Sequence, residues 1–130
     1  RVAEYLMSEF WPGPLTLLFS PGPAAPPSVL GSAGRIGIRC PDSPFLLAWM
    51  ESLRGPLVST SANLSQEPIP ETLESLREIF LDKVDFFLEG GEPAVRPAST
   101  VVDLLDSPQI VRRGAGNREI EEALAQLCRK

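Results

Sequence analysis

Apolar side chains recur in two different rhythms along this chain, and runs of proline and glycine separate the segments that carry them. Residues 1–10 have apolar positions at helical spacing, and the Pro-Gly-Pro run at 12–14 ends the pattern, which predicts a helix. Residues 15–19 are a short apolar run of the kind that forms a buried strand. Residues 20–34 contain too many prolines and glycines for a regular element.

The remaining segments continue this alternation. The patterns predict strands at residues 35–40, 56–59, 84–88, 99–104 and 109–113, the last two joined as a hairpin, and helices at residues 44–53, 71–80 and 118–127. Asp42 or Ser43 would cap the first of these helices, which has Pro44 in its first turn, and Asn117 would cap the last. Strands and helices interleaved in this way indicate an α/β (α+β) domain with a mixed sheet flanked by helices.

Composition narrows the range of functions. A net charge of −5 argues against broad electrostatic binding to nucleic acid, which needs clustered Lys and Arg. Because the chain contains no histidine, a Ser-His-Asp or Cys-His hydrolase is excluded within it. No apolar run is long enough for a transmembrane helix, and two cysteines without metal-ligand spacing fit a reducing cytoplasm. The first residue is Arg1 rather than Met, so we expect an upstream part of the protein.

Polar side chains gather where predicted strands end. Residues 59–65 hold three serines, a threonine and an asparagine, which either bind a polar ligand or form an ordinary polar turn. Arg35 and Arg39 are four apart on a predicted strand and therefore share one face, with Gly37 between them. Two guanidiniums there would clamp a carboxylate or phosphate, unless they are only the charges of a solvated edge strand.

The C-terminal hairpin and the turn at residues 11–16 add to this set. Ser99 and Asp103 would share one strand face, and Arg112 or Arg113 would return beside Ser99 if the hairpin forms. Each segment alone fits an ordinary polar surface. Together they offer hydroxyls, an amide and arginines to an anionic ligand, which suits nucleotidyl transfer, because that chemistry depends mostly on positioning and charge stabilisation.

Five segments, in this order, resemble the YrdC-like family of threonylcarbamoyl-adenylate synthases. They are Phe10-Trp11-Pro12-Gly13-Pro14-Leu15-Thr16, Ile36-Gly37-Ile38-Arg39-Cys40-Pro41, Ser61-Ala62-Asn63-Leu64-Ser65, Ser99-Thr100-Val101-Val102-Asp103 and Val111-Arg112-Arg113-Gly114. Each is weak alone, whereas five in order are a specific signal. The resemblance implies a single YrdC-like domain with a twisted mixed β-sheet flanked by helices. Residues 1–130 would be the C-terminal two-thirds of that domain, which lacks its N-terminal part.

The resemblance also implies an activity. Such an enzyme joins L-threonine, bicarbonate and ATP into threonylcarbamoyl-AMP and releases pyrophosphate, and Mg²⁺ would accompany the ATP. The product would serve N6-threonylcarbamoyladenosine formation in tRNA, through downstream tRNA threonylcarbamoyltransferase proteins. The implied L-threonine contacts are Arg39, Ser59 and Ser99, and the implied ATP contacts are Arg35, Ser61, Asn63, Arg112 and the backbone of Ile69. No residue is implied as a general acid or base.

The sequence departs from the family pattern in ways that affect these expectations. Gln66 stands where the family usually has Gly, and Arg113 where it often has Pro. Two upstream family segments are absent, including one rich in Lys and Arg that grips the phosphates, so we expect little or no activity from the chain alone. The alternatives are a YrdC-like paralogue, the carbamoyl-adenylate domain of a hydrogenase-maturation protein, and a noncatalytic module that binds tRNA or double-stranded RNA.

Overall fold

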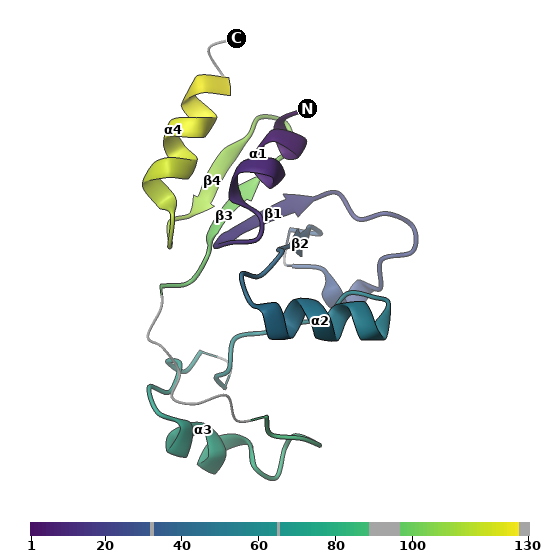
Figure 1. The fold of residues 1–130 in the computed structure, drawn as a ribbon, viewed down its shortest axis with the longest axis vertical. Helices are drawn as coiled ribbons and strands as arrows, with labels where there is room; N and C mark the ends of the chain where they lie inside the picture. The colour runs from purple at the N-terminus through teal and green to yellow at the C-terminus, as the bar shows by residue number, and fades with distance from the viewer. Residues whose placement is uncertain (32, 65, 89–96, 128–130) are drawn as a thin grey trace. The chain divides into compact units, whose positions relative to one another are not determined.

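The computed structural model describes residues 1–31, 33–64, 66–88 and 97–127. The described residues divide into two compact units, residues 1–57 with 97–127 and residues 58–88. In chain order the elements are α1 (Val2–Phe10), β1 (Leu15–Phe19), a 3-10 helix (Pro27–Val29), β2 (Ile36–Ile38), α2 (Pro44–Leu53), α3 (Leu73–Phe80), β3 (Thr100–Asp103), β4 (Gln109–Arg112) and α4 (Asn117–Leu127) (Figure 1). The alternation of strands and helices confirms the predicted α/β class.

The first unit contains a mixed sheet with the strand order β2-β1-β3-β4. Strand β1 pairs in parallel with β3 and antiparallel with β2, and β3 pairs antiparallel with β4. The predicted hairpin between the last two strands is therefore confirmed. Strand β2 lies at an edge of this sheet and pairs with β1, and an isolated antiparallel bridge also joins its first residue, Ile36, to Leu30.

The strand register separates an apolar face from a polar face. Leu17 lies opposite Val102, whereas Thr16 lies opposite Val101. Because successive strand residues point to opposite faces, one face carries Leu15, Leu17, Thr100 and Val102, and the other carries Thr16, Leu18, Val101 and Asp103. Helices α1 and α4 cover the first face, where Leu6, Ile120, Ala123 and Leu124 complete the buried core (Figure 1).

Side-chain caps account for the starts of α2 and α3, whereas Asn117, expected as the cap of the last helix, is the first residue of α4. The Ser43 hydroxyl accepts a hydrogen bond from the Leu46 N–H at 3.4 Å, so Ser43 rather than Asp42 caps α2. In the second unit, the Thr72 hydroxyl caps α3 in the same way, and the helix therefore begins at Leu73 rather than at residue 71. Among the helices in the described residues, none combines the length and apolar character needed to cross a membrane.

Two of the predicted strands are wrong. Residues 56–59 and 84–88 belong to no strand of the structure. Both segments carry apolar side chains with high β-propensity, but a strand forms only where a second strand completes its hydrogen-bond ladder. Their side chains are also largely exposed, with Val58 at 77% and Phe86 at 86%. The strand expected at 35–40 is confirmed only over Ile36–Ile38.

Leu17 is fully buried on the apolar face, so its truncation tests the assignment of that face. We expect Leu17→Ala to lower the free energy of unfolding by about 2–5 kcal/mol, because a buried leucine leaves both lost transfer energy and a cavity. The control Val111→Ala, on the exposed side of β4, should change it by about 0.5 kcal/mol or less. Urea denaturation measures both, and equal losses would contradict the assignment.

Candidate functional site

Ser99 is the centre of a polar cluster on the second sheet face. Its hydroxyl lies 2.8 Å from the Thr16 hydroxyl and accepts a hydrogen bond from Arg112 Nη2 at 3.1 Å. Arg112 also donates to the Ser99 carbonyl oxygen from Nε at 3.2 Å and from Nη2 at 2.9 Å. The prediction that an arginine of the hairpin returns beside Ser99 is confirmed for Arg112. The sequence alone does not reveal this role of Thr16, because it depends on the register of β1 against β3.

Arg39 lies just after β2 and is anchored through only one part of its guanidinium. Its Nε donates to the Gly13 carbonyl oxygen at 3.0 Å, and the Gly13 N–H donates back to the Cys40 carbonyl oxygen at 2.9 Å. Among the described residues, its two terminal nitrogens have no partner. Since the side chain is exposed, these nitrogens form a fork suited to a ligand carboxylate.

The turn at Gly13 and Pro14 joins Arg39 to the Ser99 cluster. The Pro14 carbonyl oxygen accepts a hydrogen bond from the Thr100 N–H at 2.9 Å, next to Ser99 in the chain. The turn therefore holds the amino end of β3 on one side and Arg39 on the other. Arg39 and Ser99, both expected L-threonine contacts, are thus tied to one structural element.

Arg35 differs from Arg39 because its charge is balanced inside the chain. Its Nε lies 3.2 Å from Asp103 Oδ2, and both side chains are largely buried, at 29% and 12% exposure. The backbone N–H of Leu105, 2.9 Å from Asp103 Oδ1, lowers the pKa of Asp103 below its ordinary value; burial opposes this shift, and Arg35 adds to it. The sequence does not reveal this partner of Asp103, because it depends on the pairing of both β2 and β3 with β1.

Gly37 lies on the polar face, as predicted. A Cβ atom at Gly37 would stand 3.3 Å from Leu18 Cδ2 and 3.4 Å from Thr16 Cγ2, so both of these side chains share its face. Because glycine has no side chain, the sheet surface between Arg35 and Arg39 is left open at this position. The surface around the edge strand combines an internally paired arginine with an arginine that is bound only to a neutral carbonyl.

The second unit contains Ser59, Ser61, Asn63 and Ile69, and its polar segment forms a turn. Asn63 Nδ2 donates to the carbonyl oxygens of Leu64 at 3.0 Å and Glu67 at 2.6 Å, whereas within the described residues its buried Oδ1 has no partner. The serine hydroxyls and Ile69 are in exposed residues, and Ser65 lies outside the described residues. The segment is therefore a turn that is stabilised by the Asn63 side chain and exposes its serine hydroxyls to solvent.

Gln66 explains one departure from the family pattern. Its φ is +70°, in the left-handed region that favours glycine because a side chain there crowds the backbone. The glycine expected from the family would adopt this conformation without that penalty. Gln66 therefore occupies a conformation that suits the glycine of the family pattern better.

The polar sheet face can bind an anion by charge and hydrogen bonding. Arg39 supplies a partly engaged guanidinium, and Ser99 supplies a hydroxyl whose orientation is fixed by Thr16 and Arg112. Within the described residues, no group of three or more acidic, cysteine or histidine side chains is gathered in a way that would hold a metal ion. The chemistry that this arrangement supports is positioning and charge neutralisation.

Comparison with known proteins gives consistent matches. The family model of Sua5, YciO and YrdC proteins, described as telomere recombination, matches residues 1–114. A threonylcarbamoyl-AMP synthase from Pyrococcus abyssi is 32% identical over 127 residues, which are 96% of this chain and 37% of that protein. The chain thus spans little more than a third of that relative's length.

Solved structures show the same fold. Sua5 from P. abyssi, described as complexed with L-threonine, superposes with a TM-score of 0.83 at 33% identity, over 93% of this chain and 36% of that one. YciO from Escherichia coli superposes with a TM-score of 0.77 at 31% identity, over 89% of this chain and 57% of that one. The mixed sheet and its flanking helices are therefore shared with both proteins.

The pKa of Asp103 tests the geometry of the polar face. We expect the value measured by carboxyl NMR to lie below the ordinary 3.8, and in Arg35→Gln to rise yet stay below it, because the Leu105 N–H remains. A folded-state pKa below the unfolded value stabilises the fold above pH 3.8, and this contribution disappears as the pH falls through the folded value. A measured pKa at or above 3.8 in the unsubstituted chain would contradict the geometry.

Proposed function

The chain belongs to the Sua5/YciO/YrdC family, and on that premise we propose that it is part of an L-threonylcarbamoyladenylate synthase. The enzyme would be a nucleotidyltransferase that acts on L-threonine, bicarbonate and ATP. Its product would serve N6-threonylcarbamoyladenosine formation in tRNA, in the cytoplasm. Residues 1–130 would form the C-terminal two-thirds of a single YrdC-like domain.

The proposed reaction has two bond-forming steps. The L-threonine amine and bicarbonate give a carbamate and water. A carbamate oxygen then attacks the α-phosphorus of ATP, the bond between the α- and β-phosphates breaks, and pyrophosphate leaves. Catalysis of this kind depends mostly on alignment and on stabilisation of phosphate charge, which arginines and hydroxyls supply without a histidine base.

One observation carries the L-threonine assignment. Arg39 is held at Nε by Gly13 and keeps its terminal nitrogens exposed, which prepares it for a bidentate contact with the amino-acid carboxylate. Ser99 lies at the other side of the same turn, with its hydroxyl oriented by Thr16. Ser59 is proposed as a further L-threonine contact because of its position in the family pattern.

The ATP contacts are proposed from their positions in the family pattern. In the first unit they are Arg112 and Arg35. Arg112 donates to Ser99 through Nε and Nη2, which leaves Nη1 for the nucleotide. Arg35 is paired with Asp103 through Nε. In the second unit, we assign Ser61, Asn63 and the backbone of Ile69. Mg²⁺ would arrive bound to the ATP phosphates, because this ion prefers phosphate and water oxygens to a protein cage.

A YrdC-like paralogue with another substrate is the second candidate. The match to YciO supports it, since its TM-score of 0.77 at 31% identity is close to the 0.83 at 33% identity of Sua5. Both candidates use the same polar face. L-threonine-dependent pyrophosphate release by the full-length gene product distinguishes them, because a paralogue would release none in response to this amino acid.

We expect the 130-residue chain alone to release little or no pyrophosphate from ATP, L-threonine and bicarbonate. The reason is that its sequence contains no segment like the family's Lys- and Arg-rich one that grips the phosphates. The full-length gene product, assayed in parallel, is the positive control. Robust turnover by the chain alone would show that the segment is dispensable.

Two substitutions in the full-length gene product separate the two substrates. Arg39→Ala should raise KM for L-threonine about 30-fold, as expected for about 2 kcal/mol from a lost charged contact. Ser61→Ala should raise KM for ATP about fivefold, as expected for about 1 kcal/mol from a neutral hydrogen bond.

Matched controls are available for both. Arg118→Ala removes an exposed arginine of α4, and Ser107→Ala removes an exposed serine of the hairpin turn. Both should leave the two KM values within twofold of the unsubstituted enzyme. Unchanged kinetics in Arg39→Ala and Ser61→Ala would overturn the site assignment.

A further inference from the structure

The turn between β4 and α4 sets the position of Arg112. Arg112 is the last residue of β4, and its guanidinium reaches Ser99 by three hydrogen bonds. An exposed arginine has many rotamers, so these contacts persist only if the main chain around it is held in place. Whatever holds residues 113–116 therefore also controls where the Arg112 guanidinium lies.

Close packing holds one side of this turn. A Cβ atom at Gly114 would overlap the Ala98 carbonyl oxygen and stand 2.7 Å from the Ser99 carbonyl carbon, so only glycine fits. The Ala115 N–H also donates to the Ala98 carbonyl oxygen at 2.8 Å. The turn consequently lies directly against the backbone that leads into Ser99.

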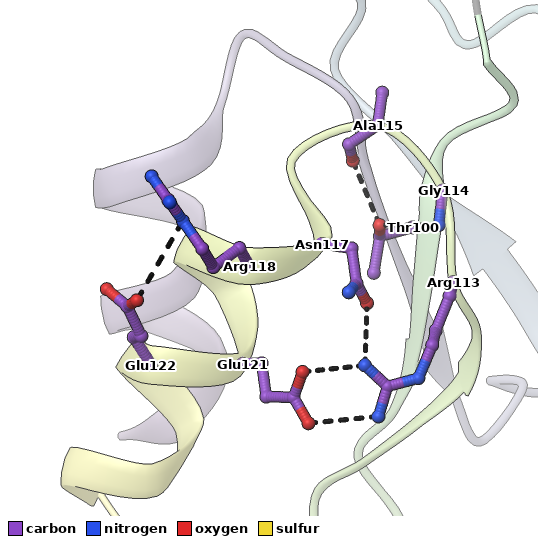
Figure 2. A network of polar contacts seen from close by, with 8 residues as sticks. All are labelled: Thr100, Arg113, Gly114, Ala115, Asn117, Arg118, Glu121 and Glu122. Carbon is purple, nitrogen blue, oxygen red and sulfur yellow. Dashed lines mark hydrogen bonds and ion pairs between the residues drawn. The ribbon is translucent and has the colours of Figure 1, made fainter.

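A single buried hydroxyl fixes the turn from inside. Thr100 is fully buried, and its Oγ1 accepts a hydrogen bond from the Gly114 N–H at 3.0 Å while donating to the Ala115 carbonyl oxygen at 2.9 Å (Figure 2). Both hydrogen-bonding capacities of the hydroxyl are thus used on one turn. Because Thr100 belongs to the apolar sheet face, it is not placed to touch a ligand on the polar face.

A salt bridge holds the turn from outside. The Arg113 guanidinium makes two parallel hydrogen bonds to the Glu121 carboxylate, at 2.6 and 2.9 Å, and a third to Asn117 Oδ1 at 3.3 Å (Figure 2). These side chains are exposed, at 61% for Arg113 and 51% for Glu121, so water and salt weaken the pair. The buried hydroxyl is therefore the stronger restraint.

We propose that Thr100 is a positioning residue that fixes Arg112 against Ser99 and thereby sets the affinity of the site for ATP. The proposal rests on the proposed function, in which Arg112 contacts the nucleotide. Without the Thr100 hydroxyl, the Gly114 N–H and the Ala115 carbonyl lose their buried partner, and the turn moves to regain one. Arg112 would move with it.

The test combines Thr100→Val, which keeps the shape of the side chain, and Thr100→Ser, which keeps the hydroxyl, with Arg112→Ala in the full-length gene product. Calorimetry measures the Kd of MgATP. Thr100→Val should raise it about tenfold in the unsubstituted background and less than twofold in Arg112→Ala, because residues that act as a unit are not additive. Thr100→Ser should stay within threefold.

A control and a second variant complete the design. Glu121→Gln, which weakens the outer bridge, should change the Kd of MgATP less than twofold. If Thr100→Val does not fold, Thr100→Cys replaces it, since a thiol is a weak donor and acceptor. Equal weakening by Thr100→Val in both backgrounds would overturn the proposal.

The Arg112 Nε–H resonance separates this proposal from the proposed function. Measured without ligand, the resonance should be protected from exchange in the unsubstituted protein and in Thr100→Ser, and should lose protection in Thr100→Val. Retained protection in Thr100→Val would overturn the positioning role. Lost protection with unchanged MgATP affinity would instead support positioning and contradict the nucleotide role of Arg112.

Discussion

The parallel pairing of β1 with β3 is the constraint on which the rest of the first unit depends. It joins segments that lie more than 80 positions apart, as the hydrogen bond between Thr16 and Ser99 illustrates. The register puts Leu17 and Val102 into the core under α1 and α4, and by the alternation of strand side chains it puts Thr16 and Asp103 on the opposite face. A slip of one residue would exchange the two faces and bury the polar groups.

The polar groups on that opposite face are restrained to different degrees. Arg35 is neutralised by Asp103, Arg112 is bound to Ser99, and Arg39 is bound at one nitrogen to a neutral carbonyl. This gradation matters for binding, because a guanidinium held at Nε alone keeps its terminal nitrogens for a ligand, whereas an unrestrained one loses conformational entropy when it binds. The charge of Arg35 is thus already balanced by Asp103, whereas that of Arg39 has no acidic partner among the described residues.

Local features of the sequence predicted much of this, and long-range contacts account for what it missed. The cap at Ser43 and the apolar run of β1 can each be predicted from a few neighbouring residues, and both were confirmed. The strand expected at residues 84–88 was wrong, because β-propensity does not reveal whether a partner strand exists. The partners of Asp103 and Thr100 depend on register and on the turn after β4, neither of which a local pattern contains.

The central claim is that the polar sheet face bearing Arg39, Ser99 and Arg112 binds the substrates. A crystal structure of the full-length gene product with L-threonine and a nonhydrolysable ATP analogue tests it most directly. The account predicts the L-threonine carboxylate within hydrogen-bond distance of the Arg39 terminal nitrogens and a nucleotide contact to Arg112. Ligands bound on the face covered by α1 and α4, or away from the sheet altogether, would contradict it.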